Sequence, residues 1–268
     1  MKQFVLVMLI LLSVSSNSQE LFVFTEPASN MATKSIGLRL NSYFYKTDLS
    51  GNNTYLTPEV MFGVSKNMMI HADVFINNQF NNFQIRGGSI YFKYRFYTND
   101  DVQRHFRMAF FARGSLNNTF IQQKEINLYG VNSGFEGGIV ATQLLHKVAL
   151  SSAVSFDNAI DNGSHQYIYG SNDSKAINYT LSFGKLILPK EYKDYRQTNL
   201  NLLLDLLSQY NLDIRKYYVD VCPAAQLIIN SQGRIDIGYR KQISSTLLRL
   251  NADGFFLRLE YNFFNVYK

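Results

Sequence analysis

The sequence predicts an all-β protein, a closed antiparallel transmembrane β-barrel of about twelve strands. Three observations predict this class: an N-terminus typical of exported proteins, apolar and polar residues that alternate over strand-length segments, and connections that alternate between short and long. A tilted strand of about ten residues is long enough to cross a bilayer. Beyond the N-terminal run no apolar stretch approaches the roughly 18 residues of a spanning helix, which excludes a helical membrane protein.

The N-terminus has the pattern of a secretory signal peptide. Lys2 supplies a positive charge, residues 4–14 are almost entirely apolar, and the small residues Ser16 and Ser18 precede the expected cleavage site. A permanent helical anchor is the alternative, but it needs about 20 apolar residues. The expected organisation is a cleaved signal peptide at residues 1–18, a periplasmic or lumen-contacting segment at 19–33 and the barrel at 34–268.

Alternation at period two defines the strands along the rest of the chain. The first segment places Ile36, Leu38 and Leu40 on one face and Arg39 and Asn41 on the other. The same pattern recurs to the C-terminus. The expected strands are residues 35–45, 54–65, 68–77, 85–98, 105–116, 130–143, 147–157, 175–188, 197–209, 215–229, 233–242 and 253–265.

The last segment alternates most clearly. Leu257, Leu259 and Tyr261 share one face, and Arg258 and Glu260 share the other. An Arg that faces lipid near the middle of a bilayer costs about 2–4 kcal/mol, whereas an Arg in the lumen stays hydrated. We therefore expect the apolar face to meet lipid and the charged face to meet polar groups of the first and eleventh strands.

The lengths of the connections distinguish a membrane barrel from a soluble β-sandwich, whose strands also alternate apolar and polar residues. Outer-membrane barrels have short turns on the periplasmic side and longer loops outside. The short connections are 65–67, 99–103, 144–146 and 230–232, and the longer ones, rich in Asn, Gly and Ser, are 46–53, 78–84, 117–129 and 158–174. Residues 189–196 are a longer exception on the short side. Six tyrosines near strand ends are expected to form interfacial girdles: Tyr43, Tyr45, Tyr97, Tyr217, Tyr218 and Tyr239.

The polar faces predict a charged lumen. A dry core could not hold so many ionisable groups, so we expect the lumen to be narrow, wet and crossed by ion pairs. The expected lumen-lining charged residues are Arg39, Glu59, Asp73, Lys93, Arg95, Arg107, Arg113, Glu136, Asp205, Asp220, Asp236, Arg258 and Glu260.

Two arrangements of these charges are open. The basic residues from Lys93 to Arg113 could face Asp220 and Asp236 across the pore and set up a transverse field that orients solutes. Alternatively, neighbouring charges neutralise one another, which the nearby Arg234 and Arg240 favour.

Candidate chemistry is sparse. Ser164 and His165 are the residue types of a lipid hydrolase, but adjacent residues of an extended chain point apart. His71 and Asp73 share a face at a spacing that a metal could use, without a third ligand close in sequence. Pro223, after the single cysteine Cys222, predicts a bulge. We expect no enzyme activity, no metal and no cofactor.

The composition restricts the kinds of partner that we expect. Only 17% of the residues are charged, against about a quarter in soluble proteins. One cysteine excludes an internal disulfide. The net charge of +6 is spread without basic runs, so we expect no nucleic-acid partner.

Residues 19–31 (QELFVFTEPASNM), the strand pattern and the aromatic last strand (FFLRLEYNFF) together resemble uncharacterised outer-membrane barrels of Bacteroidota-type bacteria, often called transporters. The resemblance implies a place in the cell outer membrane, contact with its lipid, and folding by a barrel assembly machinery that reads the last strand. This chain ends in Val266-Tyr267-Lys268 rather than in the terminal aromatic more usual there.

These features favour a passive, porin-like pore or transporter for small polar solutes. Two alternatives stay open: a barrel hydrolase acting on lipid, and a structural or adhesive barrel with a closed lumen. The sequence leaves the solute and the oligomeric state undetermined.

Overall fold

The computed structural model describes residues 22–47, 51–78, 82–101, 104–163, 174–189 and 197–267. The expected signal peptide at residues 1–18 lies outside this range, as do Ser164 and His165. Within it, no helix is long and apolar enough to cross a membrane.

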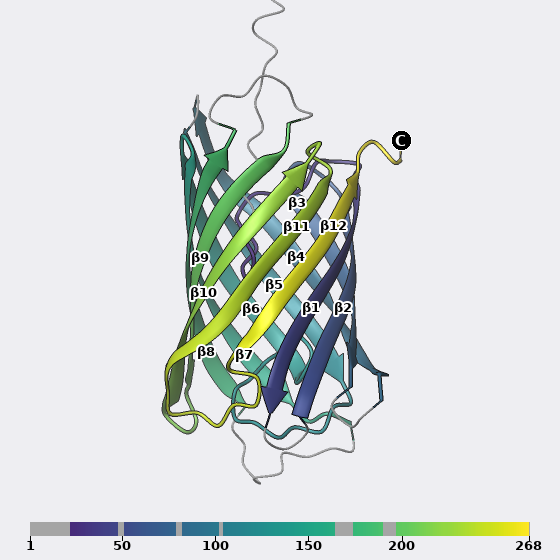
Figure 1. The fold of residues 1–268 in the computed structure, drawn as a ribbon, viewed down its shortest axis with the longest axis vertical. Coiled ribbons are helices and arrows are strands. Elements are labelled where there is room, and N and C mark those ends of the chain that lie inside the picture. Colours follow the sequence, from purple (N-terminus) through teal and green to yellow (C-terminus); the bar gives the residue numbers. More distant parts are fainter. Residues whose placement is uncertain are drawn as a thin grey trace, which may run out of the picture.

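The described residues form a closed antiparallel barrel of twelve strands, which confirms the predicted class (Figure 1). Each strand pairs with the next in sequence, and β1 closes the ring against β12. The strands are β1 (Ile36–Thr47), β2 (Gly51–Gly63), β3 (Met68–Asn77), β4 (Gln84–Asp101), β5 (Arg104–Asn117), β6 (Ser133–Leu145), β7 (Val148–Ile160), β8 (Lys175–Leu188), β9 (Asn199–Asn211), β10 (Lys216–Ile229), β11 (Gly233–Ser245) and β12 (Gly254–Phe263).

The outward face of the barrel is apolar. Ile90 is 64% exposed and Leu116 71%, and exposed Leu, Ile, Val and Phe side chains recur on every strand from β3 to β9. In β12, Leu259 and Tyr261 point outward while Arg258 and Glu260 are buried inside, as the alternation predicts. A one-residue slip would turn all of these side chains over, so the alternation specifies the register strongly.

The tyrosine girdle predicted from the sequence is only partly correct. Tyr97 and Tyr217 are exposed on the outside, but Tyr45 and Tyr218 are buried within the barrel and Tyr43 faces its cavity. Parity explains the correction: Tyr43 and Tyr45 fall on the same face of β1 as the buried Arg39. Proximity to a strand end does not determine which face a side chain occupies.

The bulge expected at Pro223 lies elsewhere. The β10–β11 register shifts between Val219 and Asp220, while Cys222 and Pro223 continue in register with Asp205 and Leu204 of β9. A bulge adds one residue to a strand and redirects the side chains around it. Here it lies next to Asp220, whose side chain is fully buried in the lumen.

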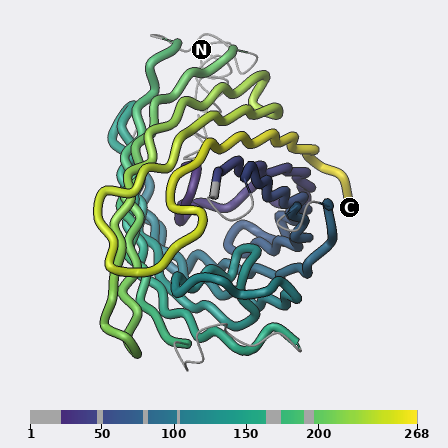
Figure 2. Tube along the Cα trace, turned by 60° about the horizontal axis from the view of Figure 1, so that its bottom comes forward, coloured from purple at the N-terminus to yellow at the C-terminus, as the bar shows by residue number. Residues whose placement is uncertain are grey.

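Two irregular segments occupy the interior. One is the inner segment, residues 22–35, which leads into β1 and lies inside the ring of strands, drawn in purple in Figure 2. The other is the inner loop, residues 118–132, which joins β5 to β6 and buries Ile126 and Leu128 against Ala159 and Ala176. The inner segment reaches the end of the barrel with the short turns, and the inner loop enters from the other end. Two segments that do not belong to the sheet therefore occupy part of the lumen.

Candidate functional site in the barrel lumen

The N-terminal part of the inner segment is held by charged side chains of the wall. The Phe22 carbonyl accepts hydrogen bonds from Arg234 Nη2 at 2.7 Å and Arg258 Nη1 at 3.2 Å, and the Val23 carbonyl accepts one from Arg258 Nη2 at 2.6 Å. The Phe24 amide donates to Asp205 Oδ2 at 3.1 Å. Buried backbone groups outside a sheet need such partners, and here charges of β9, β11 and β12 provide them.

The middle of the inner segment is held by β4 and β6. Lys93, whose side chain is fully buried, donates from Nζ to the carbonyls of Pro27 at 2.6 Å and Ser29 at 2.8 Å. The Ala28 amide donates to Thr142 Oγ1 at 2.9 Å. Hydrogen bonds to charged groups are worth about 1.5–3 kcal/mol each, so Lys93 contributes strongly to docking.

Arg39 of β1 joins the inner segment to the wall. Its guanidinium contacts Glu26 at 2.7 Å, Glu260 at 2.8 Å and Glu59 at 3.3 Å. Burial by itself would raise the pKa of Glu26, but Arg39 and then Lys93 outweigh it and hold that pKa well below its usual value. Glu26 is therefore ionised in the docked segment.

The inner loop is held by a separate group of charges. Its Glu125 contacts Arg249 Nε at 2.7 Å and Arg240 Nη2 at 3.2 Å, and both arginines also reach Asp220, at 2.7 Å and 2.6 Å. The Arg249 guanidinium lies 3.7 Å from the centroid of the Tyr218 ring. Burial raises the pKa of Glu125, and the two arginines more than reverse that effect, so it lies below its usual range.

Glu125 and Arg249 are site residues that the sequence reasoning missed. Both lie in connections between strands, where no alternation marks a side chain as inward. A buried charge is expected to have a partner, but nothing in the sequence pairs these two residues across 124 positions of chain.

The remaining predicted lumen residues of β3, β5, β6, β11 and β12 pair with their neighbours. Arg113 lies 2.6 Å from Asp73 and 3.7 Å from Glu136. Its guanidinium carbon is 4.7 Å from the centroid of the Tyr129 ring and 5.1 Å from that of the Tyr91 ring. The pairs of β11 and β12 are Arg234–Asp236 at 2.6 Å, Arg234–Glu260 at 3.4 Å and Arg258–Asp236 at 3.6 Å.

Arg95 and Arg107 lie toward the short-turn end of the barrel. Arg107 pairs with Asp100 at 2.9 Å, and Arg95 donates to the Lys66 carbonyl at 2.8 Å. The four basic residues of β4 and β5 thus have separate local partners, and Asp220 and Asp236 are paired with arginines. Of the two charge arrangements considered from the sequence, local neutralisation describes Arg107, Arg113, Asp220 and Asp236. Lys93 and Arg95 instead donate to backbone carbonyls.

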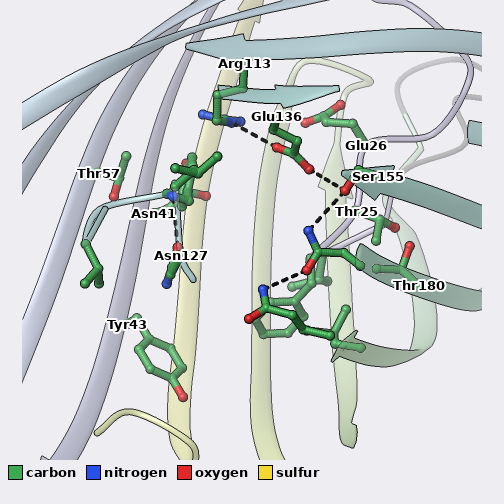
Figure 3. A pocket seen from close by; sticks show the side chains of 18 of the residues that line it. Thr25, Glu26, Asn41, Tyr43, Thr57, Arg113, Asn127, Glu136, Ser155 and Thr180 are labelled. Atoms are coloured by element: carbon green, nitrogen blue, oxygen red, sulfur yellow. Dashed lines mark hydrogen bonds and ion pairs between the residues drawn. The ribbon is translucent and has the colours of Figure 1, made fainter. Parts of the chain in front are cut away.

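A cavity of about 330 Å³ is left between the inner segment, the inner loop and the wall. Figure 3 shows its polar side, where Glu136 lies between Arg113 and Ser155. Its lining combines charged groups such as Arg39, Glu59 and Asp157 with aromatic rings such as Phe111 and Phe256. This volume is at the lower end of the range of small-molecule sites.

His71 faces this cavity next to a carboxylate. Its Nδ1 lies 2.5 Å from Glu59 Oε1, and Asp73, the other half of the metal pair considered from the sequence, contacts Arg113 and Ser89 instead. In the part of the chain that the structure describes, no group of three or more His, Cys, Asp or Glu side chains could hold a metal ion.

No protein-family model and no curated protein matches the sequence. Among solved structures, the barrel is similar to OmpT, an outer membrane protein of Vibrio cholerae (6% identity, 88% of this chain and 99% of that chain, TM-score 0.34). It is also similar to Salmonella typhi OmpF in complex with daunomycin (10% identity, 85% and 97%, TM-score 0.36) and to a mutant porin of Rh. blastica (8% identity, 85% and 99%, TM-score 0.27). Likenesses this distant bear on neither the activity nor the solute of this chain.

Proposed function

We propose that this chain is an outer-membrane β-barrel that passes small polar solutes, and that the inner segment closes its lumen until it is displaced. The observation that carries the proposal is the docking of the inner segment. Side chains and backbone of residues 22–29 bond to charged and hydroxyl groups of the wall, and none of this segment forms part of the sheet. Such a segment can leave without opening the barrel.

The outward face supports the membrane setting. A soluble protein rarely exposes a continuous apolar surface, whereas a lipid-facing barrel requires an apolar band around its whole circumference. The closed ring also leaves no strand edge unpaired, as a bilayer demands. Lipid, and the machinery that assembles such barrels, are the partners that this setting implies.

The polar interior supports solute passage. Once the inner segment has moved, the groups that it neutralises, including Lys93 and Arg258, face the lumen and must be hydrated. A wet passage lined by both signs of charge suits small polar solutes. We assign the chain no catalytic step, since the hydrolase alternative depends on Ser164 and His165, which lie outside the described residues.

A closed structural or adhesive barrel is the second candidate, because the docked segment fills the lumen in this structure. Planar-bilayer recording of the refolded full chain separates the two. We expect rare openings, and Lys93→Met should raise the open probability about tenfold or more because it removes two charge-assisted hydrogen bonds to the inner segment.

Lys241→Met is the matched control for Lys93→Met, because Lys241 is exposed and pairs with Asp253 outside the lumen. It should leave the openings unchanged. If folded Lys93→Met protein gave no conductance at all, the pore proposal would be wrong and the closed barrel would stand.

A further inference from the structure

The wall formed by β6 and β7 holds two carboxyl groups side by side, only one of which contacts a basic side chain among the described residues. Glu136 and Asp157 are direct cross-strand partners and both line the cavity. Glu136 is 3.7 Å from Arg113, which lies closer to Asp73 at 2.6 Å. Asp157 belongs to no ion pair among the described residues: its Oδ2 accepts a hydrogen bond from Asn178 at 2.8 Å, and its Oδ1 has no partner although the residue is only 4% exposed.

Four other lumen carboxylates are paired more closely, and Asp205 accepts a hydrogen bond from a backbone amide instead. Asp73, Asp220, Asp236 and Glu260 each contact at least one arginine within 3.4 Å. Two neighbouring carboxylates in a poorly hydrated place repel each other and are costly to bury. A positive charge supplied from the cavity would relieve this repulsion at Glu136 and Asp157.

Apolar groups flank the acidic pair. The Phe111 ring lies against Gly138, because a β-carbon added at Gly138 would stand 2.6 Å from the ring. On the other side, Ile126 and Leu128 of the inner loop pack on Ala176, the cross-strand partner of Asp157. Ser155, on the same face of β7 as Asp157, donates a hydrogen bond to Glu136 at 2.8 Å (Figure 3).

We propose that this wall is a binding site for a small organic cation, an ammonium group attached to a compact apolar body. The ammonium binds Glu136 with Asp157 beside it, and the body lies against Phe111 and Leu128. A cavity of about 330 Å³ holds a ligand of this size. This assignment rests on the proposed function, because it names the class of solute that the lumen binds. Binding itself requires no transport and can be measured separately.

Equilibrium dialysis of the refolded full chain in detergent tests the site, because slow entry past the inner segment does not limit an equilibrium result. The probe is benzylammonium, with benzyl alcohol and benzoate as its neutral and anionic counterparts. We expect saturable binding of benzylammonium and at least about tenfold weaker binding of the other two, since a charge-assisted contact is lost.

Glu136→Gln and Asp157→Asn should each weaken benzylammonium binding about tenfold. Asp253→Asn is the control, because it removes an exposed carboxylate outside the cavity, and it should leave the affinity unchanged. If Asp157→Asn does not fold, Glu136→Gln alone decides, since its side chain is 21% exposed and less constrained.

Three results would overturn the site: no saturable binding, equal binding of the three probes, or affinity that survives both substitutions. Displacement of benzylammonium by an equal concentration of Ca²⁺ would assign the pair to a metal ion and also overturn it. Each of these outcomes leaves the conductance of Lys93→Met as a separate measurement, so failure of the site is distinguishable from failure of the pore.

Discussion

At the scale of single residues, arginine and lysine side chains in the lumen join the barrel wall to the inner segment. Arg39 binds the wall carboxylates Glu59 and Glu260 and the inner-segment carboxylate Glu26. Breaking a buried pair by removing one partner leaves an uncompensated charge. The charges of the wall and of the inner segment therefore stabilise each other. Protonating the carboxylates at low pH is the simplest way to weaken these ion pairs.

Acidification should open the lumen through Glu26. Its pKa is lower when docked than when free, because Arg39, Lys93, His71 and Arg258 face it. A carboxyl with a depressed pKa stabilises the docked state fully above its ordinary pKa and loses that contribution as the pH falls toward the docked value. Open probability should thus rise as the pH falls below about 4.5.

The measurement is channel recording against pH for the full chain and for Glu26→Gln. Other lumen carboxylates titrate too, so only the difference between the two proteins reports on Glu26. The variant should open more readily near neutral pH and respond less to acid. An identical acid response in both proteins would mean that Glu26 does not control docking.

At the scale of elements, the strands are what the sequence could predict. Alternation located all twelve, because one face is apolar and the other polar along nearly every segment, as β12 shows. Inward and outward assignment failed at Tyr43 and Tyr45, where proximity to a strand end was used in place of parity. The inner segment and the inner loop have no period. The sequence therefore predicted only that residues 19–33 lie in the periplasm or contact the lumen, and it placed no part of the inner loop inside the barrel.

The outward face of β12 gives a direct test of the membrane setting. Leu259→Arg should impair assembly into lipid vesicles, because an arginine near the middle of the lipid-facing surface costs about 2–4 kcal/mol. Leu259→Phe is the control and should assemble normally. Folded yield, read from protease protection in vesicles, compares the two. Equal yields would place position 259 away from lipid and contradict the transmembrane barrel.

At the scale of the whole molecule, the proposed function depends on the segments that lie inside the closed ring of strands. The sequence indicated thirteen lumen-lining charged residues. Nine of them are buried, Arg113 and Glu136 are partly buried and line the cavity, and Arg95 and Arg107 lie toward one end of the barrel. It could not indicate that much of this charge would be directed at an inner segment, since these contacts join residues far apart in sequence, with 235 positions between Arg258 and Val23.

Locking the inner segment in place tests the central claim most directly. Ala28 and Thr142 are adjacent, with the amide of one donating to the hydroxyl of the other at 2.9 Å, so Ala28→Cys with Thr142→Cys should form a disulfide in a Cys222→Ala background. The account predicts that the oxidised protein conducts nothing in a planar bilayer and that reduction restores the openings of the Cys222→Ala parent. Full conductance in the oxidised, locked protein would contradict it, because solutes would then pass without displacement of the inner segment.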